Sequence, residues 1–200
     1  MTGWKTKVSP YQKIITSVLL TIMVVAMIMP ASSAHAASKY LSVTATDQEK
    51  SQWCWVTAPQ IIIKFHLGSA PSQCTLVKRG KNIKDCPNKP GTLSESKRAM
   101  TQSGISSGGT TSGTVNFSTI KSDINNNRPM ILRKEWKDGK GKKTGVGHLS
   151  VIYGFNDNSG NYVSLVKIRN SNSFKSSTSY SKLTNNSDFA WTHTVHNIKK

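Results

Sequence analysis

The apolar residues that follow Gln52 recur at intervals of three and four positions, which is the spacing of one helix face. They occupy positions 54, 58, 61, 62 and 65, and Gly68 follows as a residue suited to end a helix. The pattern therefore predicts a helix over 52–65. Pro59 falls inside that helix, where it removes one backbone donor and is able to bend the axis.

Weaker signals follow this helix. The segment 71–91 reads as a loop, and the Gly/Ser/Thr-rich segment 103–114 reads as a mobile connection. Thr92 and Ser118 are candidate N-caps. Each is expected to begin a short helix, over 92–100 and 119–126.

Strand patterns dominate the second half of the chain. Residues 41–45 alternate like a short strand, and three further strands are expected over 129–133, 148–155 and 162–169. The turn residues 156–160 separate the last two, which should form an antiparallel hairpin. Helices first and strands second predict an α+β fold in which the two parts pack together.

The first 36 residues have the composition of an export signal. Three lysines precede an apolar run over 14–29, Pro30 breaks the run, and Ala34-His35-Ala36 is a small-x-small cleavage pattern. The run is short for a membrane span, although a retained N-terminal anchor is the alternative. We expect a signal peptide over 1–36 and one secreted, extracellular, monomeric domain over 37–200, with no membrane span after processing.

Charge narrows the choice of partners. The chain has 27 basic and 9 acidic residues, and without the three leader lysines 24 basic residues remain, an excess of 15. Such an excess favours anionic cell-wall polymers, acidic surfaces or acidic substrates. The aromatic residues do not interleave with the basic ones, so no specific nucleic-acid binding is expected. The histidines and carboxylates lack ligand spacing, so neither a metal nor another cofactor is expected.

Three cysteines in an exported chain cannot all pair with one another. Cys74 and Cys86 lie in a polar, lysine-rich segment, where a disulfide would close a loop of about 13 residues and stabilise the fold by about 3 kcal/mol. Cys54 then remains as a free thiol in an oxidising compartment. A buried apolar cysteine or an intermolecular disulfide is the alternative to a reactive thiol.

Cys54 stands at the start of the predicted helix. Unpaired backbone N–H groups and the helix dipole favour a thiolate there, and the thiolate is the nucleophilic form. Trp53 and Trp55 flank it. One is expected to fix the helix to the core and the other to shape a substrate wall, with core packing of both as the alternative.

A nucleophilic cysteine needs a base, and His148 is the best candidate. It follows Gly147, a residue that allows close approach, and heads the strand 148–155. His66 lies at the far end of the Cys54 helix, roughly 18 Å away. The remaining histidines of the expected domain belong to the tail 191–196, which alternates like an edge strand.

The base in turn needs an orienting partner, and the reaction needs an oxyanion donor. Asn170 ends the strand after that of His148 and is expected to reach its ring, although a turn asparagine is the alternative. Gln48, six residues before Cys54, is expected to offer its side-chain amide to the oxyanion. Gln52 is closer in sequence but is expected to point elsewhere.

Together these residues resemble the papain-like cysteine peptidases. The stretch Gln48-Glu-Lys-Ser-Gln-Trp-Cys54-Trp55 has that superfamily's Gln-to-Cys spacing, with Trp directly after the nucleophile. Gly147-His148 is similar to its histidine segment, and Lys167-Ile-Arg-Asn170-Ser171 to its asparagine segment.

The compact bacterial branch with a Trp-Cys-Trp box, which includes secreted proteins and plant-pathogen effector proteases, is the closer resemblance. The same branch has Gln-Cys, Arg-Pro and closing Trp-x-x-Thr stretches, which occur here at Gln73-Cys74, Arg128-Pro129 and Trp191 to Thr194. It usually has Asp-Pro where this chain has Asn170-Ser171. The resemblance spans about 43–195.

This resemblance implies a papain-like fold, in which a helical part carrying the nucleophile packs on an antiparallel sheet. It implies Cys54 as nucleophile, His148 as general base and acid, Asn170 as orienter and Gln48 as oxyanion donor. Trp53, Trp55 and Gly147 are the expected substrate contacts.

The resulting hypothesis is a secreted bacterial cysteine peptidase that cuts proteins or peptides through a covalent acyl-enzyme. Two alternative functions remain open. One is an amidase or transacylase acting on cell-wall or other amides, and the other is a catalytically silent, basic binding protein or toxin. The loops that would line the cleft contain no recognisable pocket chemistry, so the sequence leaves the substrate open.

Overall fold

The structure is a computed structural model that describes residues 3, 11 and 37–200. The chain divides into two compact units, Met1–His35 and Ala36–Lys200, and the fold described here is that of the second. The predicted signal peptide lies outside the described residues, apart from residues 3 and 11. Among the helices of the described part, none is long and apolar enough to cross a membrane.

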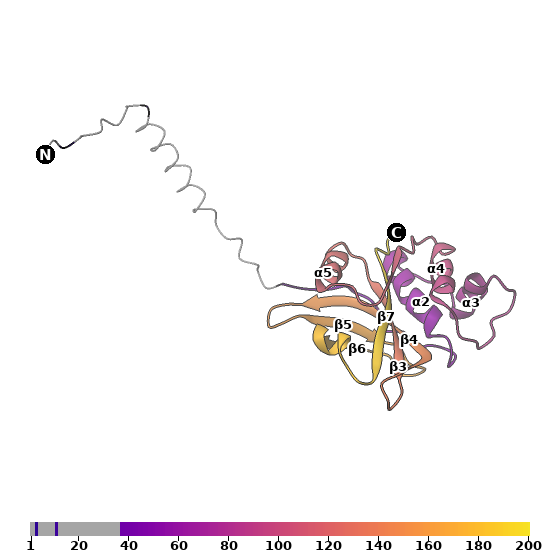
Figure 1. The fold of residues 1–200 in the computed structure, drawn as a ribbon. Helices are drawn as coiled ribbons and strands as arrows, with labels where there is room; N and C mark the ends of the chain where they lie inside the picture. The colour runs from indigo at the N-terminus through magenta and orange to yellow at the C-terminus, as the bar shows by residue number, and fades with distance from the viewer. Residues whose placement is uncertain (1–2, 4–10, 12–36) are drawn as a thin grey trace. The chain divides into compact units, whose positions relative to one another are not determined.

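Five helices accompany the sheet in the described residues. α2 (Cys54–Leu67), α3 (Gln73–Lys81) and α4 (Leu93–Thr101) gather in one cluster, while α5 (Phe117–Asn125) and α6 (Tyr180–Thr184) are separate (Figure 1). Gly68 ends α2 in the left-handed conformation, as its position predicts. Thr92 and Glu95 form a capping box at the start of α4.

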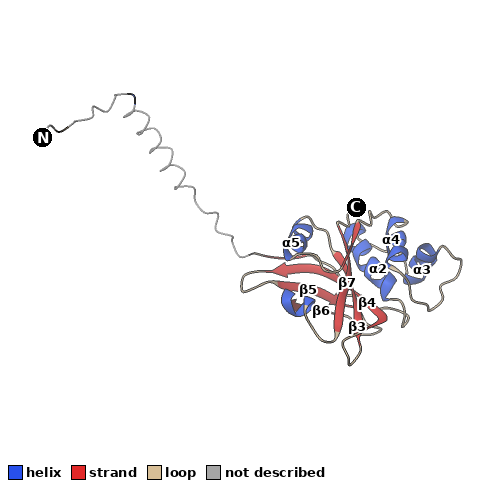
Figure 2. Cartoon of the chain, in the orientation of Figure 1, coloured by secondary structure: helices blue, strands red, loops and turns tan. Residues whose placement is uncertain are grey.

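The sheet is antiparallel throughout its strands. Its strands are β1 (Ser38–Tyr40), β2 (Gly109–Ser112), β3 (Met130–Lys137), β4 (Lys143–Asn156), β5 (Tyr162–Lys167), β6 (Phe174–Ser179) and β7 (Phe189–His196). The order is β2-β7-β3-β4-β5-β6, and β1 pairs with β4 beside this path (Figure 2). β4 and β5 form the predicted hairpin, with Val151 opposite Val166.

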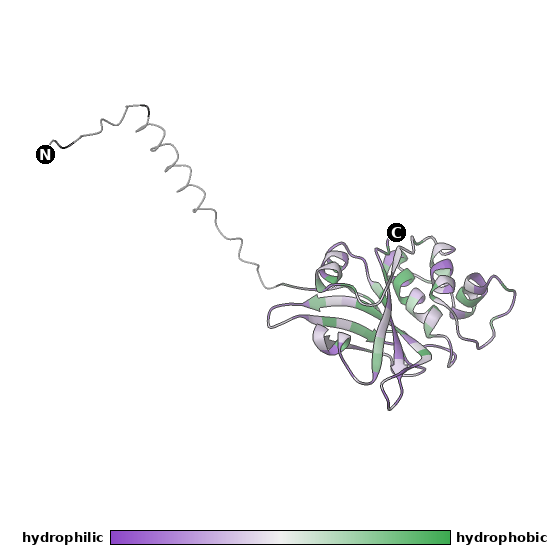
Figure 3. Cartoon of the chain, viewed as in Figure 1, coloured by the Kyte–Doolittle hydropathy of each residue, from purple (hydrophilic) through white to green (hydrophobic). Residues whose placement is uncertain are grey.

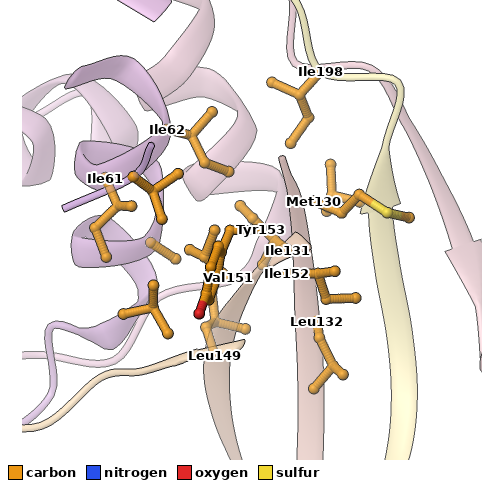
Figure 4. Packing of buried hydrophobic residues seen from close by; sticks show 14 of the residues in the cluster. Ile61, Ile62, Met130, Ile131, Leu132, Leu149, Val151, Ile152, Tyr153 and Ile198 are labelled. Atoms are coloured by element: carbon orange, nitrogen blue, oxygen red, sulfur yellow. The ribbon is translucent and has the colours of Figure 1, made fainter. Parts of the chain in front are cut away.

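The core lies between α2 and the sheet. Ile61 and Ile62 of α2 face Leu149 and Val151 of β4, and all four are buried (Figure 4). Figure 3 shows the apolar colouring concentrated in α2 and the middle of the strands, with hydrophilic loops around them. The α+β arrangement, with the Cys54 helix packed on an antiparallel sheet, is therefore confirmed.

Five parts of the sequence-based description need correction. Residues 41–45, expected as a strand, follow β1 and form no strand. The N-cap of α5 is Asn116 and not Ser118, so this helix begins two residues earlier than expected. The segment 71–91 contains α3, which Ser72 caps by accepting a hydrogen bond from Thr75 N–H. The segment 103–114, expected as a mobile connection, contains β2. The tail 191–196 belongs to β7, which is an interior strand between β2 and β3 and not an edge.

Candidate active site

A cleft of about 850 Å³ lies where the helical part meets the sheet. Its walls come from the start of α2, from residues 90–94 and 97, from β2 and β3, from residues 145–149 of β4, and from β7. Four of the expected site residues line it: Cys54, Trp55, Gly147 and His148. The structure therefore brings the candidate nucleophile and the candidate base to one cavity, although they are 94 positions apart in the sequence.

Cys54 is the first residue of α2, and this helix start has no side-chain cap and no acidic residue in its first turn. The backbone N–H groups of Leu149, Trp55 and Cys54 itself instead donate toward its sulfur. Burial raises the pKa of the Cys54 thiol above its ordinary value, against the effect of these donors and of the Arg133 charge. At rest the sulfur is therefore a thiol in a setting prepared for negative charge.

The ring of His148 is held from one side. Its Nε2 lies 2.9 Å from the carbonyl oxygen of Ile168. A carbonyl only accepts, so Nε2 bears the proton and Nδ1 has the free lone pair. Burial lowers the pKa of His148 and outweighs the carbonyl contact, and the nearby Lys134 charge lowers it further. The imidazole is therefore neutral at pH 7 and able to accept a proton.

Cys54 and His148 line the same cleft. Within residues 37–200 no hydrogen bond joins the Cys54 sulfur to the imidazole, and the contact from this part of β4 is the N–H of Leu149. Catalytic hydrogen bonds are often long before substrate binds and tighten in the complex. The arrangement is that of a neutral thiol and a neutral base placed in one cavity.

Within residues 37–200 no hydrogen bond joins Asn170 to the ring of His148. β5 ends at Lys167, so the Ile168 carbonyl stands beside His148 and Asn170 lies past the end of the strand pairing. The Oδ1 of Asn170 instead accepts a hydrogen bond of 3.4 Å from Gln48 Nε2. The orienting contact comes from the backbone, which a reading of side chains alone does not reveal.

Gln48 lies buried beside the cleft and is not among the residues that line it. Its Nε2 donates to the carbonyl oxygens of Lys50 at 3.0 Å and Ser51 at 2.8 Å. With Asn170 Oδ1, three acceptors surround the two hydrogens of this amide, while its Oε1 is buried without a partner. The contacts to Lys50 and Ser51 hold the turn that enters α2. Gln52, expected to point elsewhere, lines the cleft. The expected places of the two glutamines are thus reversed.

Trp53 and Trp55 are both buried, but only Trp55 lines the cleft. Each indole donates its Nε1 hydrogen to the carbonyl of a nearby loop residue, Trp53 to Pro87 and Trp55 to Lys89, both at 3.1 Å. The disulfide between Cys74 and Cys86 ties the start of this loop to α3. It therefore anchors the two tryptophans that flank the free thiol of Cys54.

Pro59 destabilises α2 less than the sequence suggests, because its missing hydrogen bond is replaced. Having no N–H, it cannot donate to the carbonyl of Trp55 one turn earlier. The hydroxyl of Ser96, fully buried on α4, donates to that carbonyl at 2.7 Å. A side chain from the neighbouring helix thus replaces the missing backbone bond directly behind the cleft.

The cleft also contains residues that the sequence did not single out. Arg133 of β3, Lys97 of α4 and His193 of β7 line it with Cys54. Only the tertiary fold brings these three together, because they come from three separate elements. The positive charge of Arg133 and Lys97 is the one trace that was visible beforehand, in the basic excess of the whole chain.

A family model described as the Peptidase_C39 like family matches residues 40–197 of this chain. The match includes α2 and the whole of β4, β5 and β7. A search among curated proteins found no match.

Proposed function

Because the chain belongs to the Peptidase_C39-like family of cysteine peptidases, we propose that it hydrolyses peptide bonds with Cys54 as nucleophile and His148 as general base and acid. One observation supports this most strongly. The free thiol occupies the uncapped start of α2, and it shares a cleft with an imidazole whose Nδ1 is available.

The first half of the reaction forms an acyl-enzyme. Nδ1 of His148 takes the thiol proton, and the Cys54 sulfur attacks the carbonyl carbon of the substrate. The tetrahedral intermediate collapses to a thioester, and the imidazolium gives its proton to the leaving amine.

The second half restores the enzyme. Water loses a proton to Nδ1 of His148 and attacks the thioester carbon. Collapse of this second intermediate releases the carboxylic acid, and the Cys54 thiol regains its proton from the imidazolium. The Ile168 carbonyl holds Nε2–H throughout and stabilises the positive ring, because its oxygen faces the bound proton.

The oxyanion needs donors aimed into the cleft. The N–H groups of Cys54 and Trp55 open α2 at that point, and Gln52 lines the same wall. We assign the side-chain donor to Gln52 on this geometry. Gln48, which the papain-like resemblance favours for the role, has the positioning task of holding the turn before Cys54, and through Asn170 it ties that turn to the end of β5.

The setting proposed for this chemistry is outside the cell. Residues 1–36 act as the signal peptide in this proposal, and residues 37–200 form the secreted domain. The Cys74–Cys86 disulfide supports it, because structural disulfides persist mainly in oxidising compartments.

Peptide hydrolysis by single variants tests the proposal. Cys54→Ala and His148→Ala should each lower kcat by a factor on the order of 10³ or more while the far-UV spectrum is kept. Full activity of Cys54→Ala on a peptide library would exclude the proposed nucleophile. Activity of the wild type on cell-wall amides, with none on any peptide, would move the enzyme to the amidase class.

A further inference from the structure

The residues that line the cleft include no aspartate and no glutamate, whereas Lys97 and Arg133 each bring a positive charge to it. The nearest carboxylates are engaged outside it. Glu95 binds Lys81 and the start of α4, while Glu135 binds Arg133 through one oxygen and Gly145 N–H through the other. A substrate therefore meets two positive charges on the cleft wall, of which that of Arg133 is partly balanced by Glu135.

Arg133 makes its contacts through one nitrogen. Both of its side-chain hydrogen bonds use Nη1, which donates to Glu135 Oε2 at 3.0 Å and to Thr192 Oγ1 at 2.6 Å. Within the described residues the Nε–H and Nη2–H groups donate to nothing. These two groups form the parallel pair of donors that a carboxylate accepts in a bidentate manner.

Gly147 makes room for this guanidinium. A Cβ on Gly147 would lie 2.7 Å from Nη2, 2.8 Å from Cζ and 2.9 Å from Nε of Arg133. The three distances are nearly equal, so the planar group packs face-on against the glycine and its Nε–Nη2 edge points sideways. Gly147 directly precedes His148, and the Arg133 charge favours the thiolate of Cys54. Arg133 therefore lines the same cleft as the reacting groups, with its charge near enough to act on Cys54.

The neighbouring strands extend the same surface. Arg133 of β3 is the register partner of His193 of β7, which in turn pairs with Ser112 of β2. The Nδ1 of His193 is buried without a hydrogen-bond partner. Lys97 reaches β2 from α4, with its Nζ 3.4 Å from the hydroxyl of Thr110. Polar side chains from β3, β7 and α4 thus line the same cleft.

We infer that the Nε–Nη2 edge of Arg133 binds a carboxylate of the substrate, so that the cleft selects acidic peptides with Asp or Glu near the bond that is cut. The inference rests on the proposed peptidase function and adds a specificity-determining residue to it. Lys97 contributes long-range attraction, because its ammonium lies farther along the same wall. The basic excess of the whole chain acts in the same direction.

Alkylation of Cys54 tests carboxylate binding by the Nε–Nη2 edge of Arg133 without requiring peptidase activity. Iodoacetate and iodoacetamide form the same S–C bond and release iodide, but only iodoacetate presents a carboxylate. The ratio of their rate constants cancels any change in thiolate fraction, which affects both reagents equally. In the wild type we expect the ratio to favour iodoacetate, and Arg133→Gln should lower it by a factor on the order of ten.

Four variants distinguish binding by the Nε–Nη2 edge of Arg133 from a general effect of positive charge and from loss of the fold. Arg133→Lys keeps the charge but loses the paired donors, so its ratio should fall between those of the wild type and Arg133→Gln. Glu135→Gln removes the competing carboxylate and should raise the ratio, which also keeps the test open if Arg133→Gln does not fold. Lys97→Gln should lower the ratio less than Arg133→Gln does. Lys140→Gln, in the exposed loop between β3 and β4, should leave it unchanged.

Matched peptides that differ only by Glu or Gln at each position around the cut complete the test. Wild type should show a lower KM for Glu at one position, and Arg133→Gln should abolish that difference. A ratio and a KM preference that survive Arg133→Gln would overturn the inference while leaving the peptidase proposal intact. Absence of cleavage of every peptide would overturn the peptidase proposal, while an Arg133-dependent alkylation ratio would still show the carboxylate site.

Discussion

The Nε2 atom of His148 lies 2.9 Å from the carbonyl oxygen of Ile168. This contact fixes the tautomer of the ring, because a carbonyl oxygen only accepts. A backbone atom of the neighbouring strand thereby takes the orienting task that a side chain usually has in such sites. Its position follows from the pairing of β4 with β5, so it should tolerate changes at Asn170.

The pH dependence of Cys54 alkylation should be that of a neutral thiol and a neutral imidazole. Burial raises the pKa of Cys54, so the rate with iodoacetamide should rise steadily into the alkaline range. Burial lowers the pKa of His148, so peptide cleavage should persist below the usual histidine midpoint of about 6.5 and be lost only as pH falls further. A rate of alkylation that is already maximal near pH 5 would show a thiolate–imidazolium pair instead.

Replacement of the two glutamines should have different consequences. Gln52→Ala should lower kcat by a factor on the order of 10² with unchanged stability, because it removes an oxyanion donor from an exposed site. Gln48→Ala should lower the midpoint of urea unfolding, since its buried amide satisfies the carbonyls of Lys50 and Ser51. Kinetics and unfolding of both variants decide the assignment. A large loss of kcat in Gln48→Ala at unchanged stability, with Gln52→Ala near wild type, would return the oxyanion role to Gln48.

Ser96→Ala should destabilise the protein by about 1–3 kcal/mol, because it leaves the buried carbonyl of Trp55 without a donor. Pro59→Ala restores an N–H that can reach the same carbonyl. In a double-mutant cycle measured by urea unfolding, the second change should therefore offset part of the first, with a coupling energy of about 1 kcal/mol. Strictly additive effects would show that Ser96 does not replace the missing helix bond.

Gly91→Ala should destabilise the fold by about 1–3 kcal/mol through overpacking. Its Cβ would lie 2.2 Å from the ring of Trp55, and the indole is fixed by its hydrogen bond to Lys89 and has no room to retreat. Gly139→Ala is the matched control, since a Cβ there meets nothing within 4 Å. Equal thermal midpoints for the two variants would contradict the packing described here.

The sequence was most informative where periodicity and caps agree. The apolar spacing after Gln52 and the position of Gly68 locate α2, and the turn signal over 156–160 locates the β4–β5 hairpin. These two elements position Cys54 and His148, so both residues could be selected before the fold was known.

The remaining features depend on contacts that the sequence does not encode locally. α3 is amphipathic but short and rich in lysine, and β2 is built from Gly, Thr and Ser, so neither has a strong pattern. The position of β7 within the sheet depends on how the strands pair. The partner of the Asn170 side chain depends on the register at the end of β5. For the same reason the cationic cleft wall, with Lys97 from α4 and Arg133 from β3, is visible only in three dimensions.

The central claim is that Cys54 is an activated nucleophile, and labelling followed by intact-mass spectrometry tests it most directly. The native form of residues 37–200, with its disulfide intact, is treated with an epoxide-type thiol inhibitor, and the labelled residue is then located by peptide mapping. One adduct on Cys54, formed faster than on a free thiol in solution and slowed in His148→Ala, with Cys74 and Cys86 recovered as a disulfide, is the predicted result. No adduct on Cys54, or labelling no faster than that of a free thiol, would contradict the account and favour a silent binding protein.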